Sequence, residues 1–279
     1  MENRAIDTQR GPVRGRPGKG VKRFGRVNWL GLATLTGREI RRFTNVWTQT
    51  LAAPVATALL FMAVFTLALG GQRPDVMGLP FAHFLAPGIL MMTVIQNAFA
   101  NTSSSILVSK VQGSIVDTLM PPLSPSELLT GFVLGGVFRG LFVAAGVAAV
   151  LFPLFGILPA HPLWALAFVL VGSALLALMG MITAILAEKF DHMAAITNFV
   201  VTPLSFLSGT FYSAAAVPEA FRILLHVNPI FYLIDGMRFG ALGVSDSPPA
   251  LGLAYALLAV VALGALTFRW LRTGYRLKS

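Results

Sequence analysis

The sequence predicts an all-α integral membrane protein with six transmembrane helices, an N-terminal interfacial helix and a re-entrant helix pair before the last span. The first observation is composition: 56% of the 279 residues are hydrophobic and only 11% are charged, whereas soluble domains carry about a quarter charged residues. The second is the recurrence of apolar runs of about 20 residues, the length that crosses a hydrocarbon core.

The N-terminal segment, residues 1–27, is rich in Gly, Pro and basic residues. Residues 1–42 contain eleven Lys or Arg and three acids, Glu2, Asp7 and Glu39. This composition predicts a disordered cytoplasmic tail that contacts anionic membrane lipid. Phe24 is the only aromatic residue in this basic stretch, so nucleic-acid binding, which uses interleaved aromatic residues, is disfavoured.

A short helix is predicted directly after the tail. Asn28 is a suitable N-cap, and apolar residues recur at roughly helical spacing after it, namely Trp29, Leu32, Leu35, Ile40 and Phe43. This pattern indicates a helix in the membrane interface, although an extension of the first span fits the same residues.

Five runs qualify readily as spans: 46–69, 84–108, 128–152, 162–187 and 250–271. A sixth, 194–212, is shorter and more polar. Six spans within one domain, 28–279, place both termini on the same side of the membrane. Positive charge marks that side as cytoplasmic, because it holds seventeen of the 21 Lys and Arg and the opposite side holds only Arg73, Arg222 and Arg238.

The segment between the last two spans is too apolar for a free loop and too charged to cross the membrane. Pro218 starts one short predicted helix, and Asn228-Pro229 ends it and starts a second. Glu219/Arg222 and Asp235/Arg238 are spaced i, i+3, so each pair can neutralise itself. We expect two helices dipping into the outer leaflet, where broken backbone is tolerated if it packs against protein.

No catalytic, cofactor-binding or metal site is predicted. The chain lacks cysteine, and its four histidines are scattered. Gly18-Lys19-Gly20 lacks the remaining residues of a phosphate-binding P-loop. The chain is therefore not expected to be an enzyme, and any ATP used must be bound by another polypeptide.

The polar stretch 113–129 lies between two apolar runs on the cytoplasmic side. Ser124, Pro125 and Glu127 form a capping-box pattern that marks the start of the third span. The pattern of residues 109–120 predicts a short amphipathic helix that ends at Pro121-Pro122. It either rests on lipid or projects into a cytoplasmic partner.

Polar side chains within the spans are candidates for a translocation path. They gather on the second, third and fifth spans, and we select Thr93, Asn97, Asn101, Arg139, Asn198 and Ser205. Such residues either hydrogen-bond neighbouring helices or line a wet path. Arg139, near the bilayer middle, suits either a structural bond to carbonyls or a substrate contact. Its helix carries Gly131-x-x-x-Gly135 and Gly136-x-x-x-Gly140, which permit close helix approach.

Four stretches in this order resemble the type-2 (ABC-2) permease family of ATP-binding-cassette exporters: "FLAPGILMMTVIQNAFANTSSS", "GSIVDTLMPPLSPSELLTGFVLGGVFRGLF", "TPLSFLSGTFYS" and "NPIFYLIDGMRFGALG". The resemblance covers nearly the whole chain from Trp29. It implies a multi-pass bacterial inner-membrane permease, a homodimer joined by two copies of an ATPase that binds MgATP. It also implies outward movement of an amphipathic lipid-, glycan- or drug-like substrate by alternating access.

In that family the segment after the second span is the coupling helix that contacts the ATPase. The resemblance thus assigns ATPase coupling to Lys110, Val111, Ile115, Asp117, Leu119 and Glu127. Many family members have a basic-acidic pair where this chain has Val111-Gln112. Two other functions fit a helical membrane protein, an ATP-independent transporter or channel and a membrane-embedded enzyme. The first is disfavoured because the halves show no internal repeat, and the second because no catalytic constellation is present.

Overall fold

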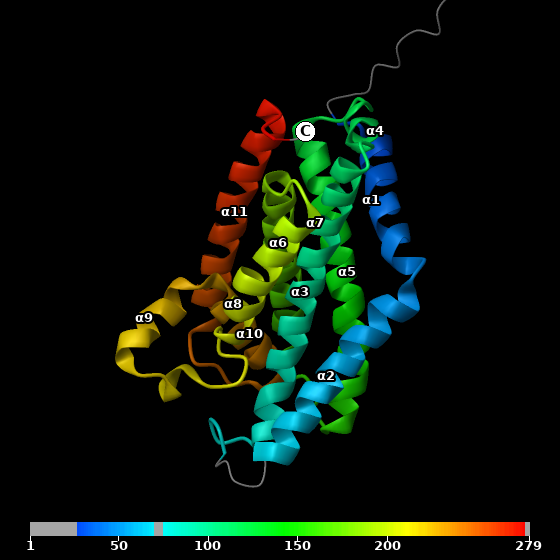
Figure 1. The fold of residues 1–279 in the computed structure, drawn as a ribbon. Coiled ribbons are helices and arrows are strands. Elements are labelled where there is room, and N and C mark those ends of the chain that lie inside the picture. The colour runs from blue at the N-terminus through cyan, green and yellow to red at the C-terminus, as the bar shows by residue number, and fades with distance from the viewer. Residues whose placement is uncertain (1–26, 70–74, 277–279) are drawn as a thin grey trace, which may run out of the picture.

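The computed structural model describes residues 27–69 and 75–276, which form a bundle of helices (Figure 1). Within these ranges the only β-type pairing is an isolated bridge between Val76 and Leu79. The prediction of an all-helical membrane protein is confirmed. The expected disordered tail, 1–27, lies outside the described residues except for Val27.

In the described part of the chain, five helices have the length and apolar composition to cross a membrane. Each coincides with an expected span to within a few residues. They are α2 (Trp47–Leu69), α3 (Phe81–Val111), α5 (Pro125–Leu154), α6 (Pro162–Leu186) and α11 (Pro249–Thr273).

The expected span 194–212 is a shorter helical stretch than the sequence predicts. It consists of α7 (Phe190–Ile196), the π-helical turn η1 (Thr197–Val201) and α8 (Thr202–Phe206). Pro203 has no N–H to donate to Phe199, and the chain widens here, so that the Thr202 N–H reaches the Thr197 carbonyl. Gly209, at φ 79°, belongs to the turn that follows. One span fewer than expected therefore meets the criteria for crossing.

Three segments lie at the same end of the bundle (Figure 1): α4 (Ile115–Leu119), the start of α1 (Trp29–Thr44) and the end of α11. We call this the α4 end. The stretch α7–η1–α8 also starts there and runs part of the way toward the opposite end.

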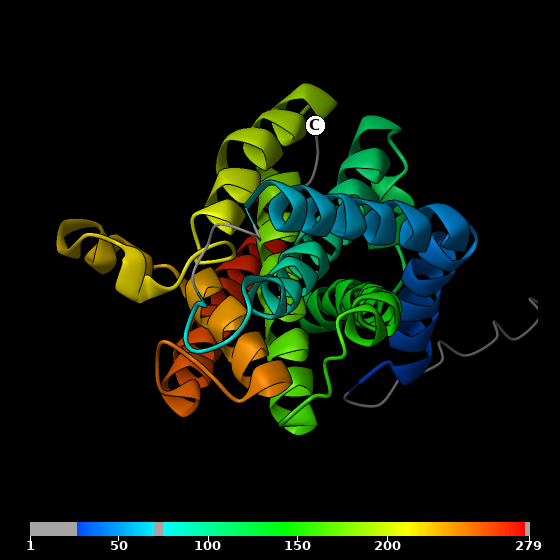
Figure 2. The ribbon, with the colours of Figure 1, turned by 90° about the horizontal axis from the view of Figure 1, so that it is seen from below.

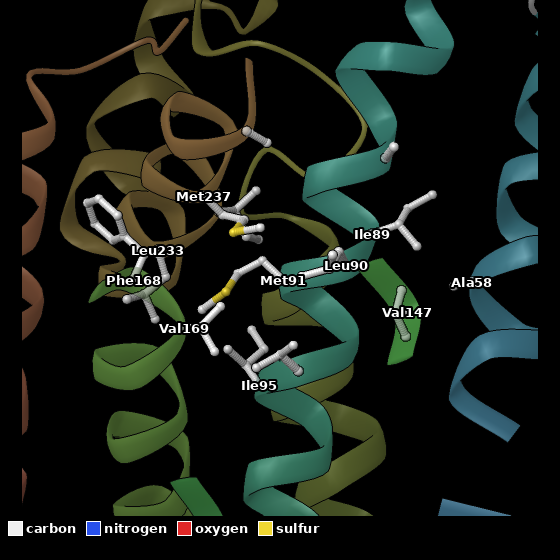
Figure 3. Packing of buried hydrophobic residues seen from close by; sticks show 14 of the residues in the cluster. Ala58, Ile89, Leu90, Met91, Ile95, Val147, Phe168, Val169, Leu233 and Met237 are labelled. Carbon is white, nitrogen blue, oxygen red and sulfur yellow. The ribbon is translucent and has the colours of Figure 1, made fainter. Parts of the chain in front are cut away.

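Helix α3 is the central helix of the bundle. The most apolar window of α3 is 78% buried, against 17% for those of α2 and α11. Figure 3 shows Met91 and Ile95 of α3 beside Phe168 and Val169 of α6, with Leu233 of the adjoining α10 (Pro229–Leu242) above them. Because lipid tails are as apolar as these side chains, close packing, and not the hydrophobic effect, holds the helices together.

The two glycine pairs of α5 face two different neighbours. A Cβ on Gly131 or Gly135 would lie 2.5 Å from Leu35 or Glu39 of α1, and one on Gly136 would lie 2.6 Å from the Ala177 Cβ of α6. The predicted close approach is therefore confirmed. Glycine at these positions lets α5 contact α1 along one face and α6 along the other.

The predicted helix after the tail is present, with Asn28 as its N-cap: the Asn28 side chain accepts a bond from the Gly31 N–H at 2.9 Å. It ends at Thr44, before α2 begins at Trp47, so it is a helix separate from the first span. It runs alongside α5 in the same direction, since Leu35 contacts Gly131 and Glu39 contacts Gly135.

The two predicted short helices before the last span are also present, as α9 (Glu219–Val227) and α10. Asn228 caps α10 through a bond from the Ile230 N–H at 3.0 Å. Figure 2 shows α9 projecting away from the bundle. Its side chains Phe221, Ile223 and Leu224 are exposed.

The packing of α5 on α6 predicts a specific sensitivity to volume. Gly136→Ala places a methyl group against Ala177 and is expected to reduce stability by about 1–3 kcal/mol, the usual cost of overpacking. The matched control is Gly264→Ala in α11, where the nearest atom to a new Cβ lies 3.9 Å away. Thermal unfolding of both variants in detergent measures the difference, and equal midpoints would contradict the packing described here.

Candidate functional site

The exposed helix α4 is anchored to the bundle on its inner side. Gly113, at φ 73°, ends the turn after α3, so residues 109–120 form a helix end, a turn and α4, not the single helix predicted. Ile115 is buried against Leu35, Leu107 and Leu128. The Arg38 Nη1 donates to Thr118 Oγ1 at 3.0 Å, which ties α4 to α1.

The capping box at the start of α5 is complete and has an additional partner. The Glu127 N–H donates to Ser124 Oγ at 3.3 Å, and the Ser124 N–H donates to Glu127 Oε2 at 2.7 Å. The other oxygen, Oε1, accepts from the Asn28 N–H at 2.6 Å. Glu127 therefore joins the starts of α5 and α1.

The residues expected to couple to an ATPase divide into two groups. Val111, Val116 and Asp117 are exposed, as is Met120. Lys110, Ile115 and Glu127 are buried, and the side chain of Leu119 lies outside the described part of the chain. Beside the exposed group, α1 and α4 enclose a pocket of about 390 Å³ that Leu30, Thr34 and Asp117 help to line.

Lys110 faces inward and caps the end of α6. Its Nζ donates to the carbonyls of Ala184, Ile185 and Ala187 at 3.0, 2.9 and 2.8 Å. A cation at a helix C-terminus satisfies free carbonyls and complements the helix dipole. Lys110 therefore fastens α3 to α6 and is not presented at the surface.

A buried carboxylate, Glu39, connects α1 to α3. Its Oε1 accepts from Ser105 Oγ at 2.8 Å and from Arg38 Nη2 at 3.1 Å, and its Oε2 lies 3.5 Å from Arg42 Nε. Arg42 also donates to Asn101 Oδ1 at 3.0 Å. Burial lowers the pKa of the Arg42 guanidinium, and the nearby Glu39 charge opposes this.

Sequence reasoning did not select Glu39 or Arg42 as site residues. A signal was available, because Leu35, Glu39 and Phe43 recur every four residues on one face of α1, and Leu35 and Phe43 are typical buried residues. An acid on the buried face of an amphipathic helix requires a partner.

Two pockets in the middle of the bundle adjoin α3. The first, of about 470 Å³, lies between α1, α2, α3 and α5, and its lining includes Thr93, Asn97 and Arg139. The second, of about 480 Å³, lies between α3 and the α7–α8 stretch, and its lining includes Asn97 and Asn198. Gln96 and Asn97 line both.

Two of the six expected path residues line neither pocket. Asn101 is fully buried and accepts from Arg42. Ser205 is fully buried and donates to the Val201 carbonyl at 2.8 Å. The sequence pattern grouped these residues with the lining residues because spacing alone does not distinguish a pocket from an adjacent helix contact.

A second buried polar network lies toward the opposite end. The fully buried Arg238 lies 3.6 Å from Asp235 and 4.0 Å from Asp246, and it donates to the Gly209 carbonyl at 2.9 Å. Its guanidinium also stacks 3.8 Å from the Phe84 ring centre. The predicted ion pair is present, and Asp246, which sequence reasoning did not select, is its additional member.

The other predicted pair behaves differently. Glu219 is exposed, and Arg222 donates to the Val217 carbonyl at 3.3 Å. Among the described residues, no ion pair joins Glu219 to Arg222, so this expectation is wrong. The reason is physical: an exposed i, i+3 pair gains little free energy, and the guanidinium donates to a nearby carbonyl instead.

The chain combines membrane-spanning helices, polar pockets between them and an exposed helix at one end. This combination is typical of membrane-embedded transport subunits. A family model described as "ABC-2 type transporter" matches residues 31–242. The chain therefore belongs to the ABC-2 type transporter family. In this family the transmembrane subunit lacks a nucleotide-binding domain, and the chain is a multi-pass inner-membrane permease, not an enzyme.

Individual relatives agree with this assignment. The chain is 36% identical to the inner membrane transport permease YadH of Escherichia coli K12 over 253 residues, which cover 90% of this chain and 98% of that protein. It is 23% identical to nodulation protein J of Rhizobium leguminosarum bv. viciae, covering 78% and 84% of the two chains. It is 26% identical to nodulation protein J of Sinorhizobium fredii, covering 67% and 71%.

Proposed function

We propose that this chain is the membrane-spanning subunit of an ATP-driven exporter, working as a homodimer with two copies of a separate ATPase. MgATP binds in that ATPase. The substrate is an amphipathic lipid-, glycan- or drug-like molecule, moved outward by alternating access through the pockets beside α3. The domain that does this is 28–279, and the α7–η1–α8 stretch is its sixth, shortened crossing.

The observation that carries the proposal is the construction of α4. Its outer face presents Val116 and Asp117, and its inner face is fixed to α1 through Thr118 and to the core through Ile115. A partner that pushes on the outer face therefore moves α1 and the α3–α5 connection together. Lys110 extends this linkage to α6.

The α4 end faces the cytoplasm in this proposal. Lys110, Lys189, Arg269 and Arg272 lie at or near that end of their helices, and cytoplasmic segments carry an excess of such residues. Helices α3 and α5, with 31 and 30 residues, are about 45 Å long and exceed a hydrocarbon core of about 30 Å. The ends of α3 and α5 thus protrude, and α1 packs beside α5 from this protruding end to the level of Phe142.

The helices α9 and α10 form the re-entrant pair on the outer side. The exposed apolar side chains of α9, Phe221, Ile223 and Leu224, suit contact with acyl chains of the outer leaflet. The Arg238 network lies inside protein, which is where charge at membrane depth is tolerated.

Labelling of single cysteines tests the orientation directly, because the natural chain contains none. In spheroplasts, a membrane-impermeant maleimide is expected to label Glu219→Cys and to leave Val116→Cys unlabelled until the membrane is opened. Both side chains are exposed on the described chain, so neither is shielded by the bundle itself. Labelling of Val116→Cys in intact spheroplasts would reverse the assigned topology.

Two substitutions that change the charge on α4 test the coupling role. Asp117→Lys and Val116→Glu are each expected to reduce recovery of the ATPase that co-purifies with the unaltered chain by roughly tenfold, because an unmatched charge at an interface costs about 1–3 kcal/mol. The matched control is Asp75→Lys, which makes the same charge change at an exposed position at the opposite end. Undiminished recovery and ATPase stimulation, or absence of any co-purifying ATPase, would refute the proposal.

A further inference from the structure

Arg139 occupies an unusual position for a charged side chain. It lies fourteen residues after the first residue of α5, or about 21 Å along a helix about 45 Å long. This places its guanidinium near the middle of the bilayer. A charged side chain at that depth is costly and requires a protein, water or ligand partner.

The described structure supplies Arg139 with few partners. Its Nη2 donates to the neutral amide oxygen of Asn97, Oδ1, at 3.1 Å. No carboxylate of the described residues lies within ion-pair distance of it. The acid on the adjoining helix face, Glu39, is already shared by Arg38, Arg42 and Ser105.

Arg238 shows how the same chain treats an arginine with a structural role. Arg238 is fully enclosed, between two carboxylates, a backbone carbonyl and an aromatic ring. Arg139 instead borders an open pocket of about 470 Å³. The contrast indicates that the counter-charge of Arg139 comes from outside the chain.

The lining of that pocket suits an anion attached to an apolar chain. A second guanidinium, Arg42, and the amides of Gln49, Gln96 and Asn97 supply hydrogen-bond donors, and the lining contains no acid. The remaining lining includes the apolar residues Phe43, Val46, Ala53 and Met92. Charged donors at one place and an apolar wall beside them match an amphiphile with an anionic head group.

We propose that this pocket binds the anionic, phosphate-type head group of an amphipathic molecule, with Arg139 as its main charged contact. The proposal deepens the proposed function, since the pocket lies on the proposed translocation path. Binding at equilibrium requires neither an ATPase nor transport. A failure of ATPase coupling would therefore leave this inference standing, and a neutral cargo would overturn it while leaving the exporter intact.

Thermal unfolding of the full chain in dodecyl maltoside tests the proposal, with dodecyl phosphate as the probe. A ligand that binds only the folded state raises the unfolding temperature by an amount that increases with the ratio of its concentration to Kd. Arg139→Gln is expected to weaken the apparent affinity roughly tenfold or more, since a charge-assisted bond is lost. Arg139→Lys is expected to recover part of it. The matched control, Arg41→Gln, removes the same charge from an exposed position outside the pocket and is expected to bind as the unaltered chain does.

Two further probes test whether the pocket requires both the charge and the apolar chain. Dodecylphosphocholine has the same chain and phosphate without net charge, and inorganic phosphate has the charge without the chain. Both are expected to bind more weakly than dodecyl phosphate. Equal binding of either probe would overturn the proposal, as would equal affinity of Arg139→Gln and Arg41→Gln. If Arg139→Gln fails to fold, Gln96→Leu replaces it; a smaller weakening is expected because a neutral donor is lost, and unchanged affinity would count against the site.

Discussion

The buried carboxylate of Glu39 is the interaction on which the α4 end of the bundle depends. It accepts from Ser105 of α3, contacts both Arg38 and Arg42 of its own helix, and lies over Gly135 of α5. Three helices thus meet at one acid. Because a buried charge without partners is costly, these contacts hold α1 against α3 and α5 instead of leaving it free in the membrane interface.

The same acid also defines what the pockets can do. Arg42 and Arg139 both line the pocket between α1, α2, α3 and α5, and of the two only Arg42 has a carboxylate partner among the described residues, Glu39. At the other end, Asp235 and Asp246 enclose Arg238. One carboxylate between Arg38 and Arg42 leaves an excess of positive charge near Arg139, whereas two carboxylates face Arg238. This arrangement is suited to draw an anionic group toward the pocket beside α3.

Hydropathy and capping chemistry predicted most of the fold. Features that depend only on neighbouring residues could be predicted from the local sequence. These are the five spans, the Asn28 cap, the Ser124–Glu127 capping box and the break at Asn228-Pro229. The early end of α8 and the turn at Gly113 were not predicted, since positive φ is a property of the folded chain. Glu39, Arg42 and Asp246 were missed as site residues because each also contacts an element distant in sequence, through Ser105, Asn101 and Ser213 respectively. Arg139 was found from its depth alone.

Hydrogen exchange in Glu39→Gln tests most directly whether Glu39 links α1 to the exposed helix α4. The substitution leaves Arg38 and Arg42 without their carboxylate, and Arg38 is the residue that bonds Thr118. The linkage predicts faster exchange both in 29–44 and in 115–119, relative to Glu219→Gln, which alters an exposed glutamate. Faster exchange confined to α1, or none at all, would contradict a connection from the buried carboxylate to α4.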